Sequence, residues 1–164
     1  MTAALNFAFV HGGGQGGWVW DETIAALEMQ SKGAARAVAL DVPGCGAKRG
    51  QRNDALTIWE TAAALNADLA ERGYGDCVLV GHSQAGTLLP IMSELAPGAF
   101  AKLVYVACAA PKPGQTILEL IGSSPQGAYD DEVGAPFDPA LVVDMRERNR
   151  LRFCNDMDDR TAEA

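Results

Sequence analysis

Short, continuous apolar runs separated by polar or glycine-rich stretches recur along the first two thirds of the chain. They cover residues 6–10, 35–40, 77–80 and 103–107. Strands that are buried on both faces of a parallel sheet have this continuous pattern, whereas half-exposed strands alternate apolar and polar positions. We therefore predict four buried strands at these positions.

Between these runs, apolar residues spaced three and four apart predict helices over residues 21–32, 58–71 and 84–95. Thr57 is a candidate N-cap for the second helix, because Glu60 lies three residues later and would complete a capping box. Strands that alternate with helices imply right-handed crossovers. The predicted fold class is therefore α/β, a parallel sheet with helices on both faces.

The pattern changes after residue 115. Residues 116–121 favour a short helix, residues 123–139 are rich in Gly, Pro and Asp and favour a loop, and a further helix is expected to end near Arg150. This last part is highly charged and does not return to a strand pattern. We predict that residues 1–115 form the N-terminal part of a core and that residues 116–164 are a cap-like insertion, cut short.

Composition excludes several classes of function. The chain of 164 residues is 48% hydrophobic, enough for one domain with a sizeable core, and its formal net charge is −8. Without a Lys/Arg-rich run, neither nucleic-acid binding nor an anionic membrane surface is expected. No signal peptide and no apolar run of the roughly 20 residues needed to span a bilayer is found. The four cysteines are far apart, so we expect no metal site, reduced thiols and a cytoplasmic location.

A serine lies at a junction typical of nucleophilic catalysis. Residues 81–86, Gly-His-Ser-Gln-Ala-Gly, follow the third strand and open the third helix, with Ala85 where the G-x-S-x-G motif has its second glycine. Free N–H groups and the positive end of the helix dipole favour an oxyanion at such a turn. We predict Ser83 as the nucleophile and the Gln84 N–H as one oxyanion donor. Taken alone, the motif is also compatible with an ordinary strand-to-helix turn of a nucleotide-binding protein.

A second glycine-rich loop, residues 11–17, follows the first strand. Its glycines allow backbone N–H groups to approach a ligand closely. We expect Gly13 to supply the second oxyanion donor, with His11, Gly12 and Gly14 as the supporting loop. A dinucleotide cradle is the alternative, but the loop has neither the G-x-G-x-x-G register nor a Walker lysine. The three tryptophans are expected to be core or packing residues.

Jointly, residues 9–18, 40–46 and 80–86 resemble the α/β-hydrolase fold superfamily. The segment is most similar to the branch that contains plant methyl esterases, hydroxynitrile lyases and small bacterial esterases, over about residues 6–121 and more loosely to residue 159. The resemblance implies a Ser-His-acid triad in the chain order serine, acid, histidine. It also implies a small-molecule substrate and no cofactor.

The sequence departs from this family in its histidines. It contains only two, His11 and His82, and both precede Ser83. The resemblance gives His11 a structural role and places the triad histidine and acid downstream, so we expect neither in this chain. We likewise expect the C-terminal strands of the sheet to lie outside this chain, and we expect Asp130, Asp131 and Glu132 to be solvated surface.

The expected function is a serine hydrolase that cleaves a carboxylic ester or related acyl compound through Ser83. It would be active only if a C-terminal half supplies the histidine and acid, either as the rest of a longer chain or as a second chain that docks on the sheet edge. A truncated, catalytically inactive relative that binds a ligand is a third possibility. A lyase of the hydroxynitrile type on the same site is the alternative reaction.

Overall fold

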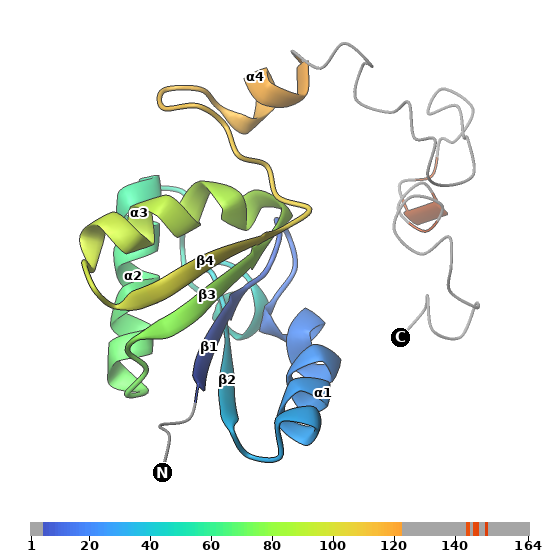
Figure 1. Cartoon of the computed structure of the whole chain (residues 1–164). Coiled ribbons are helices and arrows are strands. Elements are labelled where there is room, and N and C mark those ends of the chain that lie inside the picture. Colours follow the sequence, from blue (N-terminus) through green and yellow to red (C-terminus); the bar gives the residue numbers. More distant parts are fainter. Residues whose placement is uncertain (1–4, 123–143, 145, 148–149, 151–164) are drawn as a thin grey trace. The chain divides into compact units, whose positions relative to one another are not determined.

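The computed structural model describes residues 5–122, 144, 146–147 and 150. Four strands, β1 (Leu5–Val10), β2 (Ala35–Leu40), β3 (Cys77–His82) and β4 (Phe100–Val106), form one sheet in the order β2-β1-β3-β4 (Figure 1). Every pairing in it is parallel, which confirms the predicted fold class. The fourth strand begins at Phe100, earlier than predicted, because Lys102 interrupts its apolar run.

The helices are α1 (Asp21–Ser31), α2 (Ile58–Glu71), α3 (Leu88–Leu95) and α4 (Ile117–Gly122), with 3-10 segments η1 (Gly17–Trp20), η2 (Gly46–Lys48) and η3 (Ser83–Thr87). The predicted capping box of α2 is present. The Thr57 hydroxyl accepts the Glu60 N–H at 3.2 Å, and the Glu60 carboxylate accepts the Thr57 N–H at 2.8 Å.

The predicted start of the third helix at Gln84 is wrong. Residues 83–87 wind as a 3-10 helix, and the α-helix begins only at Leu88. The tighter winding goes with a close contact, since a Cβ on Gly86 would overlap the Ala109 carbonyl oxygen and lie 2.8 Å from the Cys108 Cβ. Contacts between segments far apart in the sequence therefore shape this turn.

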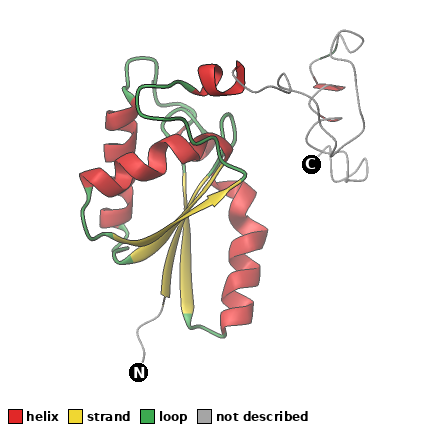
Figure 2. Cartoon of the chain, turned by 45° about the horizontal axis from the view of Figure 1, so that its top comes forward, coloured by secondary structure: helices red, strands yellow, loops and turns green. Residues whose placement is uncertain are grey.

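Two hydrophobic clusters occupy opposite faces of the sheet, so the prediction of helices on both faces is confirmed (Figure 2). On one face, Phe9, Trp20 and Val80 pack with Ile24 and Leu27 of α1. On the other, residues of α2 and α3 cover the sheet; the buried members of this cluster are Ala8, Val10, Leu40, Ala62, Leu65, Leu69, Cys77, Leu79, Ala85, Leu88, Leu89 and Met92.

Burial on both faces is wrong for β4. Val104, Tyr105 and Val106 are 39%, 45% and 41% exposed, because among the described residues β4 is an edge strand that pairs only with β3. The expectation for the tryptophans is correct only for Trp20, since Trp18 and Trp59 are 64% and 46% exposed. Trp18 lies in η1, directly after the glycine-rich loop, and Trp59 lies in the first turn of α2, and both rings are on the surface.

The chain divides into two compact units, Met1–Ile117 and Leu118–Ala164, and the whole sheet belongs to the first. The short helix predicted at residues 116–121 corresponds to α4. The predicted loop and acidic residues within 123–139 lie outside the described residues, as does most of the helix expected to end near Arg150. A cap-like role for residues 116–164 stays a prediction. Within the described part of the chain, no helix is long and apolar enough to cross a bilayer.

Candidate active site

The strand order places β1 beside β3 at the centre of the sheet. From β1 the chain continues into α1 on one face, and from β3 it continues into α3 on the opposite face. Two neighbouring strands whose connections leave toward opposite faces form a topological switch point, where open α/β sheets bind ligands at the carboxyl ends of the strands. Val10 pairs with Gly81, so both loops leave the sheet at the same level.

Ser83 stands at this point in a left-handed backbone conformation. It is the first residue after β3, and its φ is +53°. A non-glycine residue in this region costs about 1–3 kcal/mol and persists where surrounding contacts enforce it, often at functional sites. Here the Ser83 carbonyl accepts the Ala109 N–H at 2.9 Å. The side chain is only half-buried, and its hydroxyl has no hydrogen-bond partner among the described residues.

Small residues make the sharp turn possible. A Cβ on Gly81 would lie 2.9 Å from the Ala85 Cβ, a distance that real Cβ atoms essentially never show. Ala85 itself is 1% exposed, so the methyl group that replaces the usual second glycine is accommodated in the core beside Gly81. Strand and helix touch here, as the motif requires.

The glycine-rich loop after β1 lies directly against this turn. A Cβ on Gly12 would lie 3.1 Å from the Ser83 Cβ, and a Cβ on Gly13 would overlap the Gln84 carboxamide oxygen. Gly14 is farther out, exposed and at φ +74°, with nothing near its Cβ position. The structure therefore brings the predicted nucleophile and both predicted donor segments together, while their chemical roles stay predictions.

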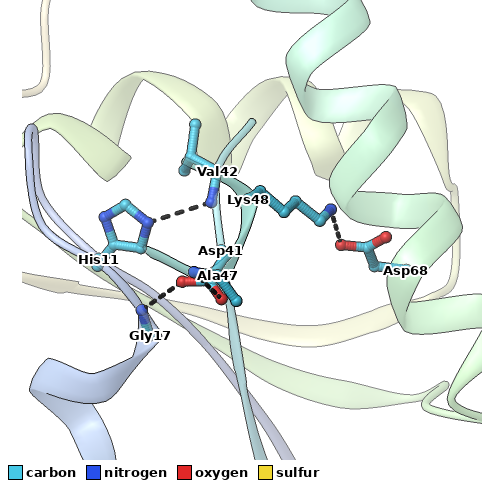
Figure 3. Close-up of polar contacts among 7 residues, drawn as sticks. All are labelled: His11, Gly17, Asp41, Val42, Ala47, Lys48 and Asp68. Atoms are coloured by element: carbon cyan, nitrogen blue, oxygen red, sulfur yellow. Dashed lines mark hydrogen bonds and ion pairs between the residues drawn. The ribbon is translucent and has the colours of Figure 1, made fainter. Parts of the chain in front are cut away.

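Neither histidine hydrogen-bonds to Ser83. His11 is 2% exposed, and its Nε2 accepts the Val42 N–H at 3.1 Å (Figure 3). Its Nδ1 lies 2.7 Å from the Gly12 carbonyl oxygen. Because Nε2 is an acceptor, the proton assigned to this neutral ring is on Nδ1, where it donates to Gly12. Both ring nitrogens are thus occupied, and His11 has no free nitrogen with which to act as a base.

His82 packs against Trp20 on the α1 face of the sheet. Side chains alternate along β3, so His82 shares the α1 face with Val78 and Val80. Its ring meets Trp20 edge-on, with ring centroids 6.4 Å apart at an interplanar angle of 84°. Among the described residues, Ser83, the predicted nucleophile, therefore has no histidine hydrogen-bonded to it.

Two further residues contact the site and were not singled out from the sequence. Asp41, which follows β2, accepts the Gly17 N–H at 2.7 Å and the Ala47 N–H at 3.2 Å. In the sequence, Asp41 lies in the segment 40–46 that carries the family resemblance, as a carboxylate at a strand end before a Pro-Gly turn, and no role was assigned to it there.

Cys108 follows β4, and its thiol donates to the Gly81 carbonyl at 3.0 Å. Burial raises the pKa of the Cys108 thiol, which keeps it protonated and able to donate at neutral pH. In the described residues, no group of three or more His, Cys, Asp or Glu side chains is arranged to hold a metal ion.

Comparisons with known proteins agree with this geometry. The model of the alpha/beta hydrolase family matches residues 7–164. Methylesterase 18 of Arabidopsis thaliana is 31% identical over 115 residues, which are 70% of this chain and 43% of that protein. An esterase of Oryza sativa subsp. japonica is 35% identical over 116 residues, 70% of this chain and 42% of that protein. The chain thus spans less than half the length of these relatives.

The solved structure of polyneuridine aldehyde esterase superposes with a TM-score of 0.63 at 24% identity, over 84% of this chain and 55% of that one. At this identity the likeness shows the fold alone.

One similar Arabidopsis methylesterase is named as chloroplastic. The cytoplasmic location predicted from the cysteines stays a prediction.

Proposed function

Because the chain belongs to the alpha/beta hydrolase family, we propose that it carries the nucleophile half of a serine esterase active site that acts on small-molecule esters. Ser83 attacks the ester carbonyl, and the backbone N–H groups of Gly13 and Gln84 stabilise the oxyanion that forms. The observation that carries the proposal is the left-handed Ser83 at the switch point, with Gly12 and Gly13 packed against it.

The geometry suits acyl transfer. Ser83 begins the 3-10 segment η3, so the N–H groups of its first turn have no partner within the segment and can donate to a ligand. Donors that are already in place before the reaction need no reorganisation, and losing one such donor costs about 10²–10³-fold in kcat in serine hydrolases. The named esterases and methylesterases among the relatives support this reaction class.

We infer that the general base and the triad acid come from residues beyond those in this chain. A serine hydroxyl is a weak nucleophile without an adjacent base. The sequence contains no histidine after Ser83, and the two that it contains are held in other contacts. The relatives are more than twice as long as their matched segments, which leaves room for a C-terminal half.

The exposed edge of β4 supports the same proposal. Val104, Tyr105 and Val106 lie on an edge strand whose outer side has no described partner. Additional strands that pair in parallel with β4 would cover these side chains and would end at the same rim of the sheet as Ser83. The histidine and acid are therefore expected on loops that follow such strands, in the same chain or in a second one.

Hydrolysis of p-nitrophenyl acetate tests the proposed reaction, with the full-length protein compared with its Ser83→Ala variant. We expect a burst of p-nitrophenol equal to the enzyme concentration and a loss of about 10³-fold or more in kcat for the variant. Turnover within twofold of the unmodified protein would refute Ser83 as the nucleophile. Release of cyanide from mandelonitrile without ester turnover would instead assign the lyase reaction.

The intact mass of the active species tests the origin of the base. We expect a longer polypeptide, or a second chain bound to this one, in every fraction that hydrolyses the ester. A species of 164 residues alone with kcat/KM in the ordinary enzyme range, above about 10⁴ M⁻¹s⁻¹, would contradict the inference.

A further inference from the structure

The glycine-rich loop is anchored at both ends by two adjacent residues of the neighbouring loop. At its start, the Nε2 atom of His11 accepts the Val42 N–H at 3.1 Å. At its end, the Gly17 N–H donates to Asp41 Oδ1 at 2.7 Å. Because β1 and β2 are parallel neighbours and Val10 pairs with Leu40, the two loops leave the sheet side by side at the carboxyl ends of these strands.

Asp41 binds both loops at once (Figure 3). Its second oxygen, Oδ2, accepts the Ala47 N–H at 3.2 Å, so one carboxylate joins the end of the loop after β1 to η2 in the loop after β2. Hydrogen bonds from N–H groups to an ionised carboxylate are shorter and roughly twice as strong as neutral ones. Asp41 thus holds Gly17 of the first loop while it also fixes the backbone of its own loop at Ala47.

The two loops pack closely around the Asp41 carboxylate. Gly46 has φ +51°, and a Cβ there would overlap Asp41 Oδ1. A Cβ on Gly16 would lie 2.6 Å from the Gly46 Cα, so the two loop backbones nearly touch. Asn is isosteric with Asp and would fit, but its NH₂ group would face one of the two N–H donors and could not accept from it.

The anchored loop is also closed internally, because the Gly12 N–H donates to the Gln15 side-chain oxygen at 3.0 Å. Gly13 therefore lies in a short segment whose start, middle and end are each held. It carries no polar side chain that could position it, so the place of its N–H depends on these neighbours. A displacement of about 1 Å at a reacting group can cost about 10²-fold in rate.

We propose that Asp41 is a positioning residue of the active site, which holds the Gly13 N–H at the oxyanion by clamping the end of its loop at Gly17. This rests on the proposed esterase function. Asp41 acts only through the loop and does not touch the substrate. Its role is thus in stabilising the transition state, with little effect on binding of the substrate itself.

A matched control lies in the same network. Lys48, in the loop after β2, forms an ion pair with Asp68 of α2 (Figure 3). Among the described residues, neither of these two side chains hydrogen-bonds to the glycine-rich loop. Asp68→Asn removes the same charge from a half-buried carboxylate as Asp41→Asn does. The two variants therefore differ in whether the lost contact reaches Gly17.

The test compares kcat and KM for p-nitrophenyl acetate in the full-length protein carrying Asp41→Asn, Asp68→Asn or Ser83→Ala. We expect Asp41→Asn to lower kcat about 10- to 100-fold with KM within about threefold, and Asp68→Asn to change both by less than about threefold. A kcat for Asp41→Asn within threefold of that for Asp68→Asn overturns the clamp. So does a loss that appears only in KM. Unchanged turnover in Ser83→Ala refutes the proposed function instead.

Hydrogen exchange of the unmodified protein tests the clamp even if Asp41→Asn does not fold. We expect the Gly17 and Ala47 amides to exchange together, and at least about tenfold more slowly than the exposed amide of Gly14. A Gly17 amide that exchanges as fast as the Gly14 amide overturns the proposal, independently of the turnover measured for Ser83→Ala.

Discussion

The close contact between Gly86 and residues 108–109 predicts a large effect of one added methyl group. In Gly86→Ala the new Cβ would overlap the Ala109 carbonyl oxygen, which is backbone and cannot rotate away. Ala109 also donates its N–H to the Ser83 carbonyl at 2.9 Å, so moving Ala109 loosens the turn that carries Ser83. We expect this variant to lose both stability and esterase activity.

The size of the effect follows from two contributions. Overpacking of a well-packed site costs about 1–3 kcal/mol, and loss of the hydrogen bond adds about 1 kcal/mol. A decrease near 3 kcal/mol in the free energy of unfolding lowers Tm by roughly 6–12 °C for a protein of 150–250 residues. Thermal unfolding followed by circular dichroism measures this shift.

Gly50→Ala is the matched control. Gly50 is exposed, and a Cβ there would meet nothing within 4 Å. Its free energy of unfolding is expected to stay within about 0.5 kcal/mol of the unmodified protein, as at most surface positions. If the Tm values of the two variants agree within the error of the measurement, the contact at Gly86 does not shape the turn, and the reasoning is refuted.

Four further predictions concern stability and reactivity. Thr57→Ala removes the N-cap of α2 and should cost about 1 kcal/mol in urea unfolding at neutral pH; an unchanged midpoint would contradict the capping box. Hydrogen bonds from the Thr57 N–H and hydroxyl lower the pKa of Glu60, so its stabilising contribution is full above its ordinary pKa and is lost as pH falls through the lowered one. Glu60→Gln should flatten the stability–pH curve in the range where Glu60 becomes protonated, and an unaltered curve would contradict the role of this carboxylate in the capping box. Burial raises the pKa of Cys108, so iodoacetamide at pH 7 should alkylate it more slowly than free cysteine, as mapped by mass spectrometry; equal rates would refute the assignment. Leu89→Ala in the fully buried core should cost about 2–5 kcal/mol, and a change below 1 kcal/mol would contradict its packing.

The parallel sheet and the first two helices could be predicted because their signals are local. The apolar run at residues 35–40 and the capping box at Thr57 depend on neighbouring residues only, and both predictions agree with the structure. The 3-10 turn at residues 83–87 depends on Ala109, which lies more than twenty positions away, and was predicted as α-helix. The exposure of β4 depends on which strands pair with it, and a continuous apolar run does not contain that information.

For the candidate site too, the local features could be predicted, and those that depend on strand pairing could not. Strand ends of a parallel sheet meet at one rim, which placed Gly13 and Gln84 on the same side, but only the pairing of β1 with β3 makes them neighbours. The contribution of Asp41 could not be foreseen, because its bonds to Gly17 and Ala47 require the register of β1 against β2. The histidine that would activate Ser83 has no candidate in the sequence after that residue.

Covalent labelling by a fluorophosphonate, followed by peptide mapping, tests the account most directly. This reagent phosphonylates an activated serine whose attack is stabilised by an oxyanion hole. In the full-length protein we expect one adduct per molecule, on Ser83, and no adduct in Ser83→Ala. An adduct on another residue, or equal labelling of the variant, would show that the serine at this turn is not the nucleophile.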